Sequence, residues 1–170
     1  MRKLTIVFAL LTLLTATSIW AQAKPVCSLL TASEVATVGA TGRGTEDSLP
    51  IDDGPTKGDT IKLCNWQMGA GKLSLSIARM PPGVSRAALI GQLDRGYAAL
   101  KAQGWKEEKK DFGNIFCSLM TPPVVRQDAP TTTGCLIPTK GLVVSIATLG
   151  KTRVPMERAK ALVESALRRL

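Results

Sequence analysis

CSLLT, residues Cys27–Thr31, and CSLMT, residues Cys117–Thr121, are two copies of one short sequence. A second cysteine follows each copy, and after it comes a segment in which apolar and small residues alternate. Alternation with a period of two is typical of a β-strand with one buried face. We interpret the pattern as an internal two-fold pseudo-repeat with one hairpin in each half, carrying Leu73–Ala78 and Leu142–Ala147.

The four cysteines predict two disulfides. The chain contains Cys27, Cys64, Cys117 and Cys135 and has no C-x-x-C pair, which argues against a redox or metal thiol site. Four cysteines allow three pairings. The pseudo-repeat selects Cys27–Cys64 and Cys117–Cys135, one disulfide within each half.

The composition is that of a single globular domain and narrows the possible chemistry. The chain has 170 residues, 45% of them hydrophobic, a formal charge of +9 and no histidine. The absence of histidine removes the usual general base and the commonest metal ligand. The sequence therefore favours a non-catalytic protein without metal or cofactor, and we identify no catalytic residue. A carboxylate-based enzyme, using Asp111 for example, stays open.

The N-terminus resembles a secretory signal peptide. Basic residues at Arg2 and Lys3 precede an apolar run, Leu4–Trp20, and Ala21–Ala23 forms an A-x-A cleavage signal. We therefore predict a signal peptide over 1–23 and a single secreted domain over 24–170. An uncleaved membrane anchor is the alternative. After cleavage, we expect no integral membrane segment.

The remaining pattern predicts an α+β domain. We expect one twisted antiparallel sheet of about five strands, with two longer helices packed together on one face. The sequence GAG predicts the first hairpin turn. Thr31 and Glu34 have the spacing of a capping box, and Ser85 and Gly104 are suited to begin and end the longest helix. The expected strands are 61–68, 72–80, 112–120, 134–138 and 141–149, and the expected helices are 30–38, 85–103 and one from Pro155.

The sequence offers two sets of candidate ligand-binding residues, one in a predicted loop and one on a predicted strand face. Residues 39–59 are rich in Gly, Pro and Asp and predict a long loop, in which Asp52 and Asp53 could contact a ligand. Calcium binding and simple solvation are the alternatives for this loop. The second set lies on the strand face opposite the core, where ordinary solvent exposure explains the same pattern. These residues are Ser74, Ser76, Arg79 and Ser145.

The Cys27–Glu34 segment and the Cys-x-Trp hairpin that begins at Cys64 resemble small secreted bacterial domains of unknown function. Actinobacterial lipoproteins and extracellular sensor domains are the known examples. The chain lacks their lipobox before Cys27, so the lipid anchor is not carried over. The resemblance implies binding or sensing, and it supplies no catalytic residues. It also implies a periplasmic or secreted location in a bacterium.

These observations favour an exported binding module that recognises a protein or small ligand of the cell envelope. The alternative is a salt-dependent binder of anionic envelope polymers or lipid headgroups. From Ile61 onward, basic residues outnumber acidic ones by more than two to one, which would attract polyanions. The bases are scattered and lack an aromatic ladder, so we do not expect nucleic acid to be the partner.

Overall fold

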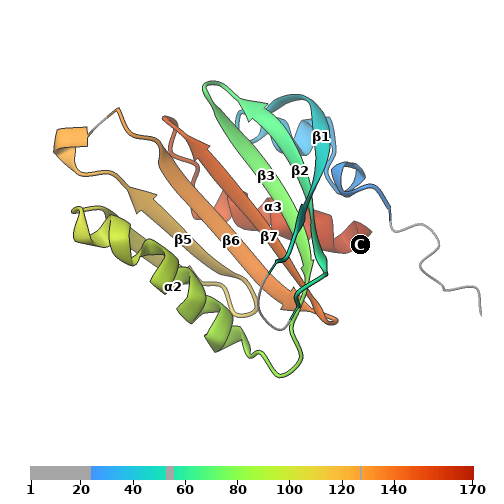
Figure 1. Ribbon diagram of the computed structural model, residues 1–170. Coiled ribbons are helices and arrows are strands. Elements are labelled where there is room, and N and C mark those ends of the chain that lie inside the picture. Colours follow the sequence, from blue (N-terminus) through green and yellow to red (C-terminus); the bar gives the residue numbers. More distant parts are fainter. Residues whose placement is uncertain (1–23, 53–55, 127) are drawn as a thin grey trace, which may run out of the picture.

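A seven-stranded antiparallel sheet forms the centre of the domain (Figure 1). The computed structural model describes residues 24–52, 56–126 and 128–170, and the predicted signal peptide lies outside them. The strands lie side by side in the order β1-β2-β3-β7-β6-β5-β4. Their bounds are β1 Thr41–Pro50, β2 Thr60–Met68, β3 Gly71–Arg79, β4 Lys106–Asp111, β5 Phe116–Thr121, β6 Thr131–Thr139 and β7 Leu142–Gly150.

The prediction of about five strands was wrong because it missed both edge strands, β1 and β4. β1 occupies part of the expected loop 39–59, and β4 is formed by the charged run KEEKKD. An edge strand pairs on one side only, and neither strand has a row of buried side chains. Every residue of β1 and β4 is exposed or half-buried, so no apolar alternation marks them as strands.

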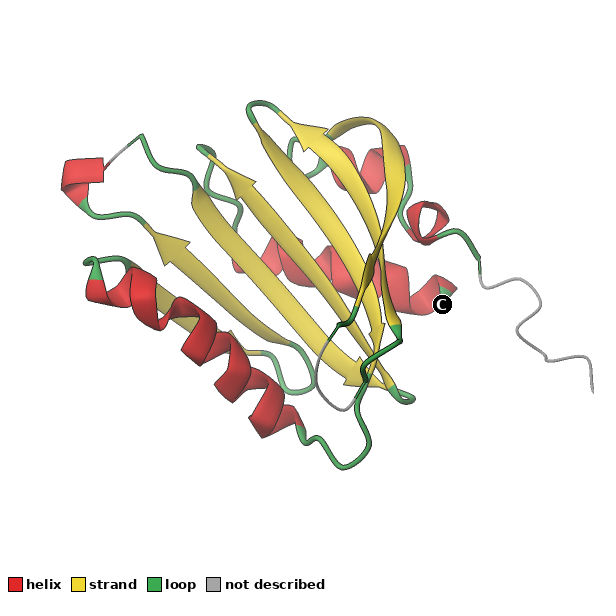
Figure 2. Cartoon of the chain, viewed as in Figure 1, coloured by secondary structure: helices red, strands yellow, loops and turns green. Residues whose placement is uncertain are grey.

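The two long helices cover opposite faces of the sheet, not one face as predicted (Figure 2). α3, Met156–Arg169, packs on β5, β6 and β7. Its Met156 carbonyl oxygen lies within 3.9 Å of the sulfurs of Cys117 and Cys135. α2, Arg86–Ala102, brings Tyr97 to Gly134, which neighbours Cys135 in the strand and therefore faces the other side. In Figure 1, α2 accordingly lies in front of the sheet and α3 behind it.

The main hydrophobic core lies between the sheet and α3. Two short N-terminal elements complete this layer, the 3₁₀ helix η1, Val26–Leu29, and α1, Ala32–Ala36. No helix within the described ranges is long and apolar enough to cross a membrane. The core combines these elements with alternate residues of the five strands β2, β3, β5, β6 and β7, among them Leu29, Val35, Trp66, Leu73, Leu75, Val144, Ile146, Leu162 and Val163.

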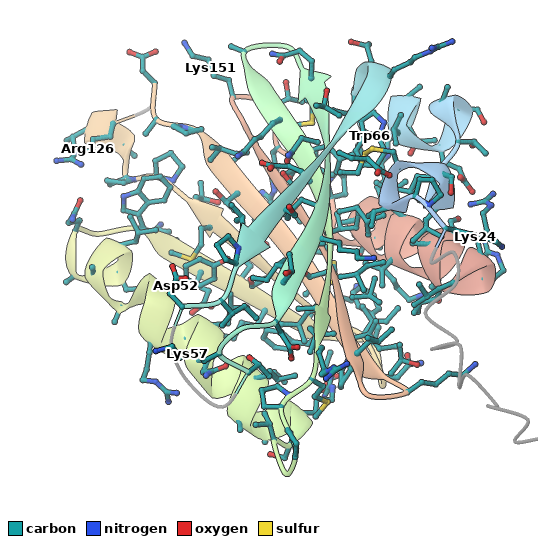
Figure 3. The ribbon with its side chains drawn as sticks, turned by 45° about the vertical axis from the view of Figure 1, so that its right-hand side comes forward. Lys24, Asp52, Lys57, Trp66, Arg126 and Lys151 are labelled. Atoms are coloured by element: carbon teal, nitrogen blue, oxygen red, sulfur yellow. A yellow bond between two sulfur atoms is a disulfide. The ribbon has the colours of Figure 1, made fainter. Side chains whose placement is uncertain are left out.

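Both disulfides lie in this core layer and have the pairing selected by the sequence. Cys27–Cys64 joins η1 to β2 across 37 residues, and Cys117–Cys135 joins β5 to β6 across 18 residues. Trp66 is 4% exposed and lies beside the first disulfide (Figure 3). Closing loops of these lengths contributes roughly 3–4 kcal/mol each on a chain-entropy argument.

The helix ends follow the predicted signals. Thr31 and Glu34 form the capping box of α1. Ser85 Oγ accepts a hydrogen bond from the Ala88 N–H at the start of α2. Gly104, with φ +85°, ends that helix, and the Trp105 N–H then donates to the Leu100 carbonyl at 3.2 Å.

The two pentapeptides that suggested a pseudo-repeat adopt different structures, and the repeat remains a prediction. β2–β3 and β6–β7 are two antiparallel hairpins, and β3 pairs with β7 at the centre of the sheet. Cys27–Thr31, however, forms η1 and a helix cap, whereas Cys117–Thr121 lies in β5. Pro25 begins a turn before the first copy, and β4 and β6 hold the second copy in the sheet. Tertiary context therefore overrides the shared sequence.

Candidate functional site

The face of β2, β3 and β7 away from the core is the candidate site, and we call it the open face. In β3, Leu73 and Leu75 are fully buried, while the alternate residues Ser74 and Ser76 are only half-buried. Register across the sheet places Ser76 opposite Ser145 of β7. The three predicted serines therefore lie together on one face.

Side-chain hydrogen bonds connect these polar residues across strands. Ser74 Oγ donates to Asn65 Oδ1 of β2 at 2.6 Å. The hydroxyl groups of Ser76 and Ser145 share a hydrogen bond of 2.6 Å. Each hydroxyl has one donor and two acceptor positions, so these pairs keep hydrogen-bonding capacity for a further partner.

Apolar side chains surround the polar row. Leu63, Val143 and Leu136 are half-buried residues of the same face, and Leu149 is 39% exposed. A mainly apolar surface with a few placed polar groups is the usual composition of a small-molecule site. The open face can thus bind a ligand that has both apolar and hydroxyl or amide groups.

Helix α2 bounds one side of the open face. Its residues reach β5 and β6 without any of them becoming fully buried. A Cβ at Gly134 would lie 3.8 Å from the Tyr97 Oη, so the phenol extends over β6. Burial raises the pKa of Tyr97, while its contact with Ser118 acts in the opposite direction. Tyr97 is therefore a neutral hydroxyl at the boundary between the helix and the sheet.

Two other predicted site residues lie elsewhere. Arg79 has the strand parity of Leu75 and so does not share the serine face, and it lies 3.7 Å from Asp59 in an ion pair. Arg79 therefore does not lie on the face predicted for it, because its position in β3 alternates with those of Ser74 and Ser76. Asp52 is exposed, just after β1 (Figure 3). Asp53 lies outside the described residues.

Asn65 and Lys72 are site residues that the sequence reasoning missed. Asn65 pairs directly with Ser74, and Lys72 is two residues before Ser74 on the same face. The signal was available in β2, where Leu63, Asn65 and Gln67 alternate with Cys64 and Trp66. The prediction of the outward face rested on the alternation in β3 and β7 alone.

The carboxylates beside α2 act as ionic anchors. Asp111 accepts two hydrogen bonds from the Arg86 guanidinium, which lowers the pKa of Asp111. The hydrogen bond from Lys109 likewise lowers the pKa of Asp94. Both are ionised and paired near neutral pH. Within the described part of the chain, no grouping of three or more Cys, Asp or Glu residues could hold a metal ion.

Comparison with known proteins identifies a structural relative but no sequence relative. No protein-family profile and no curated protein sequence matches the chain. The fold is similar to that of the extracellular domain of PknH from Mycobacterium tuberculosis. That match has a TM-score of 0.55 at 12% sequence identity and covers 84% of this chain and 92% of that one. The two domains share a fold, which agrees with the resemblance of this sequence to extracellular domains.

Proposed function

We propose that this protein is an exported, non-catalytic binding module of the bacterial envelope, and that its ligand binds on the open face. The observation that carries the proposal is a set of two side-chain hydrogen bonds, Asn65–Ser74 between β2 and β3 and Ser76–Ser145 between β3 and β7. These side chains are hydrogen-bonded across three strands on a face that stays half-exposed. A solvated surface does not require such pairing.

Two features support the location. Cys27–Cys64 and Cys117–Cys135 are both formed, and disulfides persist in oxidising compartments such as the periplasm and the cell exterior. The fold is shared with an extracellular domain. The signal peptide over 1–23 is part of the same proposal, and sequencing the N-terminus of the exported protein would test it at Lys24.

The rigid sheet suits recognition of a ligand. Six antiparallel pairings join all seven strands, and the two disulfides link η1 to β2 and β5 to β6. A preformed surface loses little conformational entropy on binding. The ligand is a small molecule or an exposed segment of an envelope protein.

The test uses two matched alanines. Ala147 is exposed on the open face opposite Ser74, and Ala161 is exposed on α3. We expect a thermal-shift screen of envelope metabolites, and a pull-down from envelope extract, to identify a ligand. Ala147→Phe should abolish its binding and Ala161→Phe should leave it intact. Equal binding by both variants would contradict the proposal. Complete loss in moderate salt with both variants would instead favour the polyanion alternative.

A further inference from the structure

A bulge in β1 displays Arg43 at the end of the open face. Thr41 pairs with Gln67 and Thr45 with Asn65, so β1 contains two more residues than β2 between these pairs. Such bulges redirect a side chain at the edge of a sheet. Gly42 has φ +78°, and a Cβ at Gly44 would lie 2.8 Å from Trp66. The positive φ thus favours glycine at position 42, and the close passage of β1 over the first disulfide requires glycine at position 44.

Two polar rows lie next to this bulge. The strand register places Thr41, Gln67 and Lys72 side by side across β1, β2 and β3. The adjacent row consists of Thr45, Asn65 and Ser74. The second row continues into the hydroxyl groups of the open face.

The bulge, together with Thr41, Thr45, Asn65, Gln67 and Lys72 of the two rows, lines an open surface hollow of about 530 Å³, which we call the Arg43–Lys72 hollow. Hydroxyl, amide and cationic groups line it, together with Trp66, and the described residues of its lining include no carboxylate. The side-chain oxygen of Asn65 accepts the hydrogen bond from the Ser74 hydroxyl, so the NH₂ group of Asn65 remains available as a donor. The hollow therefore combines two positive charges with neutral donors.

Arg43 and Lys72 belong, with Arg95 and Lys106 among others, to the basic residues that form no ion pair within the described part of the chain, whereas several others do. Arg86, Lys109, Lys110 and Arg153 are each paired with a carboxylate. Among the described residues, no carboxylate forms an ion pair with Arg43 or Lys72. Two unpaired cations beside amide and hydroxyl donors are complementary to an oxyanion, because charge-assisted hydrogen bonds are the strong ones.

We propose that the Arg43–Lys72 hollow binds an oxyanion, a carboxylate or a phosphate ester, and that this anion is the charged end of the ligand on the open face. The inference rests on the proposed function. It specifies the class of ligand that the proposed function leaves open. The ligand is an acidic molecule whose neutral part extends along Ser74 toward Ser76 and Ser145.

The experiment uses the oxidised, ¹⁵N-labelled protein recovered after export, titrated with inorganic phosphate, glucuronate and glucose. We expect phosphate and glucuronate to give saturable shifts in the side-chain amide signals of Asn65 and Gln67. The tighter of the two probes distinguishes phosphate from carboxylate recognition. Arg43→Gln combined with Lys72→Gln should weaken this binding by at least about tenfold, since it removes two charged donors.

Arg95→Gln combined with Lys106→Gln is the matched control. It removes the same charge from two exposed positions away from the hollow, and binding should stay unchanged. Equal weakening by both double variants would overturn the inference in favour of a diffuse basic surface. Absence of any shift with either anion would also overturn it. If glucose shifted the backbone amide signals of Ser76 and Ser145 while neither anion shifted any signal, oxyanion binding in the hollow would be overturned. The proposed function would remain supported. Unfolding midpoints verify that both variants fold.

Discussion

Arg86 and Asp111 are joined by two hydrogen bonds of 3.0 and 2.7 Å, which tie the first turn of α2 to the end of β4. The pair bears on stability because α2 has no fully buried residue. A helix attached mainly through half-buried side chains depends more than usual on its ionic contacts. α2 is therefore the element that we expect to open most readily.

Asp111→Asn should raise the hydrogen-exchange rates of the α2 amides. The change removes the anion while keeping the shape of the side chain, and Arg86 then loses its charged partner. Exchange in α3, which packs in the core layer, should change much less. Asp128→Asn is the control, because its partner Lys151 lies 3.5 Å away at a fully exposed site. Equal effects from the two changes would contradict the role of the Arg86–Asp111 pair.

Charges on β4 extend the same arrangement to both faces of the sheet. Glu107 contacts Lys101 of α2 at 3.0 Å, and Lys110 contacts Glu157 of α3 at 2.7 Å. Alternate charges of KEEKKD therefore serve opposite helices. No local pattern in the sequence indicates these pairings, because charge pairs with distant helices leave no signal in the run itself.

Glu34 gives a prediction for acid stability. Burial alone would raise its pKa, but hydrogen bonds from Arg169 and Thr31 lower the pKa of Glu34 to about 2. Because the pKa of Glu34 is lower in the folded than in the unfolded protein, the ionised carboxylate stabilises the fold above about pH 4.5. This stabilisation is lost as the pH falls toward 2. We expect a loss of ~1–3 kcal/mol in the free energy of unfolding across this window.

Urea unfolding of the native protein and of Glu34→Gln at pH 6, 4 and 2.5 measures this loss. The two stabilities should converge as the pH falls. Glu164→Gln removes an equal charge from an i,i+4 pair on α3 and should retain the pH dependence of the native protein. Parallel curves for native protein and Glu34→Gln would refute the assignment.

Gly44 should not tolerate a side chain. A Cβ there would lie 2.8 Å from Cys27 Sγ and from Trp66, so either β1 or the core must shift. Gly44→Ala should lower the free energy of unfolding by ~1–3 kcal/mol, as overpacking does. Gly96→Ala meets nothing within 4 Å in α2 and should stabilise by up to ~1 kcal/mol. Thermal unfolding of both variants compares them, and a neutral Gly44→Ala would show that β1 lies farther from the disulfide.

The sequence specified elements that have a local signal. The capping box of α1, the Gly104 stop of α2 and the central hairpins all depend on residues close together in the chain. β1 had no such signal, since its hydrogen bonds go to β2 and its side chains stay outside the core. The opposite placement of α2 and α3 was also inaccessible, because α2 has only half-buried residues with which to mark its packing face.

The residues of the candidate site also separate into those with a local sequence signal and those without one. Alternation in β3 and β7 was enough to place Ser74, Ser76 and Ser145 on one face. Arg79 was assigned to that face against its own parity. The hollow at Arg43 required the bulge, and a bulge depends on what lies beneath the strand, here the Cys27–Cys64 disulfide.

Tyr97 is the only tyrosine in the chain, so its titration can be followed directly. Burial raises the pKa of Tyr97 above its ordinary value of 10. Because the pKa of Tyr97 is higher in the folded than in the unfolded protein, the neutral, buried phenol stabilises the fold below the unfolded pKa. This stabilisation is lost as the pH rises through the folded pKa. Tyrosinate absorbance should therefore develop at higher pH in native than in urea-unfolded protein. Asp111→Asn, which loosens α2, should move the native midpoint back toward 10. An ordinary midpoint in native protein would mean that α2 does not hold Tyr97 against β6.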